Sequence, residues 1–211
     1  MRYICNCYKD SFFDKKYSYW EDRKITNDEM DVINFISNSK KLKLKSILHI
    51  GIGNSYFCKK IDNNCNITGI TISSKEIDKA KGLNLSNYNV FLCDKYSIDF
   101  KSLIKTKKFD LIIDTNLKSY SCCQKSFDYM MKNLIGSMNN DGMLITSING
   151  MKWFKKLKPK LSFSFKKLFY FKLKEINGNE LNILTINELK KLSRIYKLRI
   201  SFDDKLCYLK K

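Results

Sequence analysis

Proline and histidine are nearly absent from this sequence of 211 residues, which contains one of each. The single histidine, His49, lies within a short apolar run, where histidine is usually a buried core residue whose hydrogen bonds are satisfied. No other histidine is available as a general base. A reaction that depends on a histidine base would therefore have to use His49.

The sequence also lacks a long apolar run. No segment approaches the ~20 apolar residues that a transmembrane helix needs, so no membrane span is predicted. Residues 1–10 contain no apolar core of the kind that a secretory signal carries. We therefore expect a cytoplasmic protein without a transmembrane segment.

Acidic residues are scarce, since 21 Asp and Glu stand against 40 Lys and Arg, which gives a formal net charge of +19. Such a charge favours anionic partners: a phosphorylated or acidic small molecule, nucleic acid, or an anionic membrane. The basic residues are spread along the chain, and Lys, Asn and Ile are frequent throughout. A general compositional bias therefore explains the charge equally well, and both interpretations stay open.

Cysteine, in contrast, occurs eight times. An even number suits the disulfides of a small secreted protein, but this chain is longer and shows no secretory signal. Cys93 falls in a predicted strand and Cys123 on the apolar face of a predicted helix, which indicates buried, reduced thiols. A zinc site would have to combine Cys5, Cys7, Cys122 and Cys123. The CxC and CC spacings of that set are not those of zinc ribbons or fingers, so no metal site is predicted.

Apolar runs typical of buried strands alternate with helical patterns along the chain. The predicted strands are 46–51, 66–71, 88–93, 109–114, 143–148, 198–202 and 206–209. The predicted helices are 27–38, 54–61, a helix opened by Ser73 and Glu76, 121–138, and a last helix opened by Thr185 and Glu188. Residues 140–142 are predicted to turn the chain. This alternation implies parallel strands, and the short turn at 203–204 makes the last two strands antiparallel. The predicted fold is α/β, a three-layer sandwich around a seven-stranded, mostly parallel sheet with a C-terminal antiparallel hairpin.

Ligands of open α/β sheets bind beyond the carboxyl ends of the strands, so the residues that follow each strand form the candidate site. The first strand is followed by Gly51-Ile52-Gly53-Asn54-Ser55, whose glycines allow a tight turn and a close approach of the backbone to a ligand. Tyr56 stands where the dinucleotide fingerprint has its third glycine, which argues against NAD and FAD. No Gly-Lys-Ser/Thr follows, which excludes a P-loop.

The ordered motifs between residues 45 and 150 resemble those of class I S-adenosylmethionine (SAM)-dependent methyltransferases, including small bacterial members of that family. They read LHIGIGNS, ITGITISSKEIDKAK, FLCDKYS, FDLIID and DGMLITS. The resemblance implies a single Rossmann-like domain, 1–211, that binds SAM. Its parts would be an N-terminal aromatic segment and helix (1–45), the Rossmann core (46–149), an insertion (150–182) and the closing helix and strands (183–211).

The resemblance also implies a cofactor site. The glycine loop matches the segment that approaches the methionine end of SAM. Thr71 stands where most members carry an acidic residue for the ribose hydroxyls, although GITIS is similar to the GVTLS variant of cyclopropane-synthase-like members. Asp94 matches the residue that hydrogen-bonds the adenine amino group, with a turn aspartate as the alternative. The predicted cofactor-binding set is Gly51, Ile52, Gly53, Asn54, Thr71, Ile72, Asp94, Lys95 and Asp114.

Asp114 ends the fourth predicted strand and is the candidate catalytic residue. It is interpreted as a general base or a ligand of the SAM amino group, or instead as the N-cap of a helix over 115–138. The Pro-Pro-Tyr signature of amino-methyltransferases and the metal-binding pattern of some sugar methyltransferases do not follow it. An amine, thiol or carboxylate acceptor would need little help from a base, because positioning supplies much of the rate, whereas a sugar hydroxyl would need one.

Residues 150–182 correspond to a region where the family tolerates insertions that shape the acceptor pocket. Trp153, Phe154, Lys155 and Lys156 are the predicted substrate lid. Lysines beside aromatic residues suit an anionic substrate with a flat or apolar part. An extra hairpin that packs its Phe face on the core is an equal alternative.

The sequence therefore predicts a SAM-dependent methyltransferase that acts on a small-molecule or sugar-containing acceptor. One alternative is an RNA methyltransferase, motivated by the +19 charge, although 1–45 is too short for most RNA-binding appendages. Another is a non-catalytic Rossmann protein, motivated by Thr71 and by the bare motif after Asp114.

Overall fold

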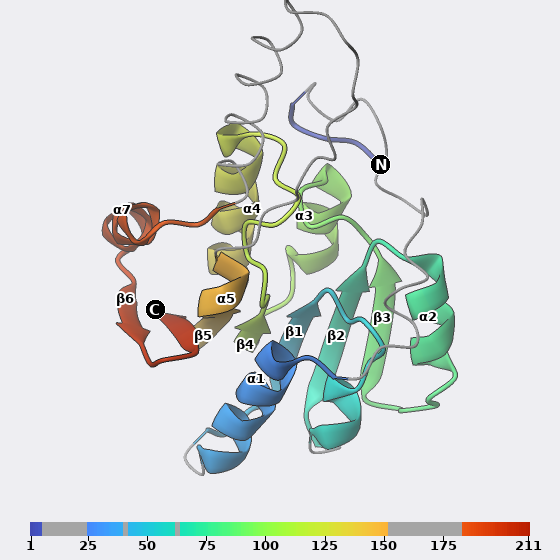
Figure 1. The fold of residues 1–211 in the computed structure, drawn as a ribbon. Helices are drawn as coiled ribbons and strands as arrows, with labels where there is room; N and C mark the ends of the chain where they lie inside the picture. The colour runs from blue at the N-terminus through green and yellow to red at the C-terminus, as the bar shows by residue number, and fades with distance from the viewer. Residues whose placement is uncertain (6–24, 40–41, 62–63, 152–182) are drawn as a thin grey trace, which may run out of the picture.

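The computed structural model describes residues 1–5, 25–39, 42–61, 64–151 and 183–211. In this part of the chain, strands form a seven-stranded sheet of order β3-β2-β1-β4-β5-β7-β6, with helices on both of its faces (Figure 1). The pairs among β1 to β5 are parallel, whereas β7 pairs antiparallel with both β5 and β6. The predicted fold, including its C-terminal hairpin, is confirmed. The strands are β1 (Ser46–Ile50), β2 (Asn66–Thr71), β3 (Tyr88–Leu92), β4 (Phe109–Ile113), β5 (Met138–Ser147), β6 (Arg199–Phe202) and β7 (Leu206–Lys210).

Alternating side chains of the central strands build two cores, one on each face of the sheet. Leu48 of β1 belongs to the core covered by α3, α4 and α7, whereas its neighbour Ile47 belongs to the core covered by α1, η2 and α2. Leu111 and Ile112 of β4 divide in the same way, as the two-residue repeat of a strand requires. The helices are α1 (Asn27–Asn38), η2 (Phe57–Lys60), α2 (Ser74–Lys81), α3 (Ile98–Ile104), α4 (Gln124–Ser137), α5 (Ile148–Met151) and α7 (Ile186–Tyr196).

Helix starts follow the local sequence closely. The capping boxes predicted from Thr26 with Glu29 and from Thr185 with Glu188 are both formed at the starts of α1 and α7. Each satisfies backbone N–H groups that the first helical turn leaves without a partner. Ser73 caps α2, because its hydroxyl accepts a hydrogen bond from the Glu76 N–H at 3.4 Å.

Three predictions about elements are wrong. The helix predicted over 54–61 is only the short 3-10 helix η2, because Gly53 and Ser55 both have positive φ and turn the chain before a helix can start. The turn predicted at 140–142 lies within β5, next to an irregularity in its pairing with β4. Helix α4 begins at Gln124 with Cys123 as its N-cap, so Asp114 does not cap it. Helix α3, capped by Ser97, was not predicted from the sequence.

The direction in which successive strands are added to the sheet reverses between β1 and β4, which makes this the topological switch point of the sheet. The chain moves outward from β1 to β3 and then returns to place β4 on the other side of β1. At such a point the loops after the two strands separate and leave a crevice at the carboxyl edge of the sheet. Residues 1–5 also lie toward this edge in Figure 1, where the Ile98 N–H donates to the Arg2 carbonyl at 2.7 Å.

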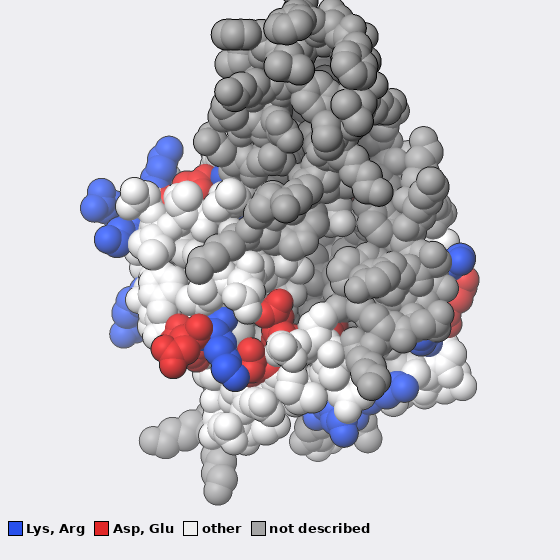
Figure 2. Space-filling model, viewed as in Figure 1, with Lys and Arg blue, Asp and Glu red and all other residues white. Residues whose placement is uncertain are grey.

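The described surface carries its charges in a scattered pattern. On the face shown in Figure 2, blue basic side chains lie at separate places along the outline, and red acidic side chains lie among them. Opposite charges also pair at the surface, since Lys205 Nζ lies 2.8 Å from Asp31 Oδ1. None of the helices in the described ranges is both long and apolar enough to cross a membrane.

Candidate functional site

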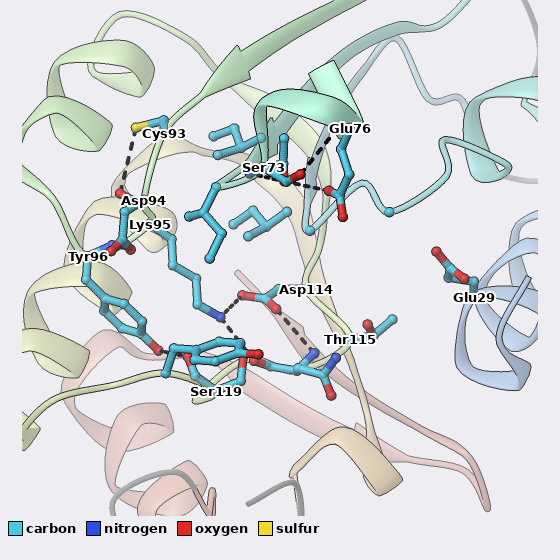
Figure 3. A pocket seen from close by; sticks show the side chains of 18 residues that line it. Glu29, Ser73, Glu76, Cys93, Asp94, Lys95, Tyr96, Asp114, Thr115 and Ser119 are labelled. Carbon is cyan, nitrogen blue, oxygen red and sulfur yellow. Dashed lines mark hydrogen bonds and ion pairs between the residues drawn. The ribbon is translucent and has the colours of Figure 1, made fainter. Parts of the chain in front are cut away.

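A pocket of about 970 Å³, its open mouth included, lies at the switch point between β1 and β4. It is lined by residues that follow β1, β2, β3 and β4, as expected for the ligand site of an open α/β sheet. Its lining includes four carboxyl groups, from Glu29, Glu76, Asp94 and Asp114, and one ammonium group, from Lys95. Figure 3 shows how these side chains converge from different elements. This acidic pocket in a basic protein favours a ligand that carries positive charge and hydrogen-bond donors.

The loop after β1 offers its backbone to the pocket. Gly51 and Gly53 both line it and have φ of +77° and +52°, a left-handed conformation that glycine adopts without strain. The Gly51 N–H donates to the Ile70 carbonyl at 2.8 Å, which fixes the loop to β2. A Cβ atom at Gly51 would meet no other atom within 4 Å. The glycine backbone therefore borders open space in which a ligand can approach it closely.

A carboxylate that the sequence motifs did not reveal stands at the end of β2. Thr71 is buried there, and its hydroxyl donates to Glu76 Oε2 at 2.5 Å. Thr71 and Glu76 line the pocket together, with Ser73 between them in the chain (Figure 3). Glu76 of α2 thus supplies a carboxylate at the end of β2, where the side chain of Thr71 itself is uncharged. The spacing from Ser73 predicts a helix start near the end of β2, but only the packing of α2 on the sheet directs the Glu76 carboxylate to Thr71.

Asp94 follows β3 and is buried at the pocket wall. Its Oδ1 accepts the Tyr96 N–H at 2.9 Å, and its Oδ2 accepts the Tyr3 hydroxyl at 3.2 Å. Burial raises the pKa of Asp94, although these hydrogen bonds oppose the rise. Burial also raises the pKa of the Tyr3 hydroxyl, so this hydroxyl stays protonated and donates. A carboxylate has about four acceptor sites, so Asp94 keeps the capacity to accept a further hydrogen bond from a ligand.

Asp114 and Lys95 form a buried ion pair across the floor of the pocket. Lys95 Nζ lies 2.7 Å from Asp114 Oδ2 and also donates to the Asn116 and Leu117 carbonyls at 3.0 and 3.1 Å. The other oxygen of Asp114 accepts the Asn116 N–H at 3.2 Å. Figure 3 shows the Lys95 side chain reaching from the β3 side to Asp114. Asp114 therefore holds the turn after β4 and neutralises Lys95, which argues against its use as a general base.

The loop after Asp114 is held by contacts with distant residues. The Tyr96 hydroxyl donates to the Ser119 carbonyl at 2.8 Å, and the buried Lys118 forms an ion pair with Glu188 of α7. Tyr120 lines the pocket with a φ of +60°. Such a conformation is uncommon outside glycine and is maintained by the surrounding structure.

His49 is buried within β1 and does not line the pocket. Burial lowers its pKa to about 4, although the nearby carboxylates of Glu29 and Asp114 act in the opposite direction. The imidazole is therefore neutral near pH 7, but its buried Nδ1 has no hydrogen-bond partner within the described residues, so the expectation that its hydrogen bonds are satisfied is wrong. Its ring packs against Phe57, with 4.8 Å between the ring centroids.

Seven of the nine predicted cofactor-binding residues line the pocket, and two do not. Those that line the pocket are Gly51, Gly53, Thr71, Ile72, Asp94, Lys95 and Asp114. The Ile52 side chain instead packs in the core on the α1 side of the sheet. The Asn54 side chain accepts the Tyr56 N–H at 3.1 Å. Sequence reasoning missed Glu29 and Glu76. The predicted lid residues, Trp153, Phe154, Lys155 and Lys156, lie outside the described residues.

Comparison with known proteins finds likeness in structure rather than in sequence. No protein-family model and no curated protein sequence matches the chain. The N-methyltransferase NodS from Bradyrhizobium japonicum WM9, solved with S-adenosylhomocysteine, aligns with a TM-score of 0.56 at 13% identity over 88% of each chain. The plantazolicin methyltransferase BpumL, solved with a substrate analogue and S-adenosylhomocysteine, aligns with a TM-score of 0.60 at 16% identity, covering 92% of this chain and 88% of its own.

A third similar structure is not named for methyl transfer. The [4+2]-cyclase SpnF aligns with a TM-score of 0.52 at 16% identity, covering 82% of this chain and 57% of SpnF. All three identities are too low to transfer an activity, but the strand order and the position of the pocket agree with the likeness. The chain has the class I SAM-dependent methyltransferase fold.

Proposed function

We propose that this protein is a SAM-dependent methyltransferase that acts on a small-molecule or sugar-containing acceptor. The observation that carries the proposal is the acidic pocket at the switch point, which combines the glycine loop with Glu76 and Asp94. Two of the similar structures, NodS and BpumL, were solved with S-adenosylhomocysteine.

The groups in the pocket fit the chemistry of SAM. The ribose hydroxyls of SAM are hydrogen-bond donors, and the buried carboxylate of Glu76 would accept from them. The adenine amino group is a donor for Asp94. The methionine end carries an ammonium group, and Glu29, which lines the same pocket as Gly51, would offer a carboxylate to it. When bound, SAM would supply a methyl group on a positively charged sulfur, which the surrounding carboxylates stabilise electrostatically.

The surroundings of Asp114 narrow the class of acceptor. Because the Lys95 ammonium lies 2.7 Å away and balances its charge, we assign Asp114 to positioning the turn after β4, where it also accepts the Asn116 N–H. Among the described pocket residues, the three remaining carboxylates, Glu29, Glu76 and Asp94, are all assigned to the cofactor in this proposal. The acceptor favoured by this arrangement is an amine, thiol or carboxylate, which needs orientation more than it needs a base. The name of NodS, an N-methyltransferase, agrees with an amine.

A binding experiment tests the proposal. Calorimetry should show micromolar affinity for SAM and S-adenosylhomocysteine, and Gly53→Val should abolish it in a protein that keeps its circular dichroism spectrum. Gly136→Ala is the matched control, because a Cβ atom at this helical position has open space around it. Unchanged binding by a folded Gly53→Val protein would show that the cofactor placement is wrong.

A transfer experiment then identifies the acceptor. Methyl-labelled SAM is incubated with the protein and with fractionated small metabolites, polysaccharide or RNA. Label in the metabolite or polysaccharide fraction supports the proposal, and label in RNA would replace it with RNA methylation. Cofactor binding without any label transfer would instead favour a protein that keeps the fold for other chemistry, as the cyclase SpnF shows to be feasible.

A further inference from the structure

Three thiols that are far apart in the sequence meet near the start of α4. Cys5 Sγ lies 3.2 Å from Cys122 Sγ, which lies 3.6 Å from Cys123 Sγ. All three sulfur atoms are within 4.8 Å of one another, and all three residues are partly exposed. None of them lines the pocket of the proposed function.

The geometry points to a site for a thiophilic d10 metal ion, Zn²⁺ or Cu⁺, held by Cys5, Cys122 and Cys123. Zinc–thiolate bonds of about 2.3 Å place neighbouring sulfur atoms of a tetrahedral site about 3.8 Å apart. The observed separations are close to that value, so small side-chain adjustments would complete the site. Among the described residues, these three thiolates would leave a fourth position of Zn²⁺ for water, or they would complete the three-coordinate environment that suits Cu⁺; Cys7 lies outside the described residues.

The three clustered cysteines differ from the other described cysteines in their exposure to solvent. Cys58, Cys65, Cys93 and Cys207 are buried, and each packs in a core cluster. Burial raises the pKa of Cys58 and Cys207 to about 12, and it also raises the pKa of Cys122, so accessibility alone sets the cluster apart. The four core thiols serve as small apolar groups. The three clustered thiols are instead accessible enough for an ion to enter.

The backbone around the cluster is already ordered. The Ser121 hydroxyl donates to the Cys123 carbonyl at 3.0 Å, and the Phe127 N–H donates to the same carbonyl at 3.2 Å as the helix begins. Cys123 is the N-cap of α4 and makes no capping hydrogen bond with its side chain. Its sulfur is therefore not used as a helix cap.

A bound ion would attach the N-terminal residues to the edge of the sheet. Arg2 and Tyr3 already contact the segment after β3, through the Ile98 N–H and the Asp94 carboxylate. Cys5 lies two residues beyond Tyr3, so its ligation would hold Tyr3 against Asp94. We infer a structural ion that orders this wall of the pocket, with no part in methyl transfer.

Metal titration of the full-length chain, reduced and freed of metal, tests this inference. Co²⁺ should bind at about one equivalent with thiolate-to-cobalt charge-transfer absorption, and Zn²⁺ should displace it. A parallel titration with Cu⁺ against a chromogenic chelator identifies the ion that is preferred. Cys5→Ser, Cys122→Ser or Cys123→Ser should each weaken Co²⁺ binding by about a hundredfold or more. The buried Cys65→Ala, at the amino edge of β2, should leave it unchanged.

Hydrogen exchange provides a readout that is independent of activity. Metal should slow exchange of the Ile98 amide, whose acceptor is Arg2, and Cys5→Ser should abolish that effect. Co²⁺ binding that persists unchanged in the three serine variants would overturn the site. So would the absence of metal binding, and a mass loss of two hydrogens after treatment with oxidised glutathione that both Cys5→Ser and Cys122→Ser abolish would assign these two residues to a disulfide instead.

Discussion

The two halves of the pocket are built in different ways. The half that follows β1, β2 and β3 takes its groups from residues next to strand ends, such as Gly51, Thr71 and Asp94. The half that follows β4 depends on contacts between distant residues, such as Lys95 with Asp114 and Lys118 with Glu188. The comparison teaches that the pocket groups after β1, β2 and β3 are positioned mainly by their neighbours in the chain, whereas those after β4 depend on contacts across the fold.

The largest change in stability is expected when the Lys95–Asp114 ion pair, in the half of the pocket after β4, is broken. Lys95→Met leaves the buried Asp114 carboxylate without its ion partner and should lower the free energy of unfolding by about 3–5 kcal/mol. Urea denaturation measures the change. A double variant, Lys95→Met with Asp114→Leu, removes both charges and should recover part of the loss. An equal or larger loss in the double variant would contradict the assigned role of the pair.

Lowering the pH should reduce the free energy of unfolding, because His49 is buried in β1, a central strand of the sheet. Burial lowers the pKa of His49 from 6.5 to about 4, so the folded state binds its proton less readily than the unfolded state does. The stability from neutral His49 is fully present above about pH 6.5 and is lost as the pH falls toward 4, by about 3 kcal/mol. His49→Gln should reduce this loss in denaturation curves measured across that range. A pH dependence identical to that of the wild type would assign the acid sensitivity to other groups.

The local half is tested at Glu76. Glu76→Gln removes the charge of a buried carboxylate that we assign to the ribose hydroxyls, so SAM affinity should fall by about ten- to a hundredfold. Glu188→Gln is the matched control, because this carboxylate lies outside the pocket lining. Calorimetry measures both variants. Equal affinity in wild type and Glu76→Gln would remove Glu76 from the cofactor site while leaving the fold assignment intact.

The smallest changes in stability are expected at two ion pairs that differ in burial. Lys118→Met breaks a pair whose lysine is buried and whose Glu188 partner is partly exposed, and it should cost about 1–2 kcal/mol. Lys205→Met breaks the pair with Asp31, in which 66% of the lysine side chain is exposed, and should leave the melting temperature almost unchanged. Thermal unfolding of both variants side by side makes the comparison. A larger loss for Lys205→Met would contradict this ranking by burial.

Local signals predicted most of the elements because they act within a few residues. The capping boxes at Thr26 and Thr185 and the apolar runs of β1 and β4 specify their own secondary structure. The prediction for 54–61 was wrong because positive φ at Gly53 and Ser55 outweighs the helical pattern. Helix α3 was missed because its seven residues are too few to show a clear apolar period.

The site residues also divide into those that the sequence predicted and those that only the packing of the fold revealed. Gly51, Gly53, Thr71, Ile72, Asp94, Lys95 and Asp114 were predicted from their places after strands, and all seven line the pocket. The carboxylates of Glu29 and Glu76 went unnoticed because each was interpreted as part of a helix cap. A residue that caps a helix can also face a cavity, and only the packing of that helix on the sheet decides whether it does.

By itself, the sequence determined the order of the strands and helices, the antiparallel hairpin at the end and the glycine turn after β1, since each depends on neighbours in the chain. Tertiary structure alone decided that Lys95 neutralises Asp114, that Glu76 supplies the acid missing at Thr71, and that Cys5 meets Cys122. The physical reason is that ion pairing, hydrogen bonding and metal ligation act over a few ångströms of space. Separation along the chain does not reveal such contacts until the sheet and its helices have brought the residues together.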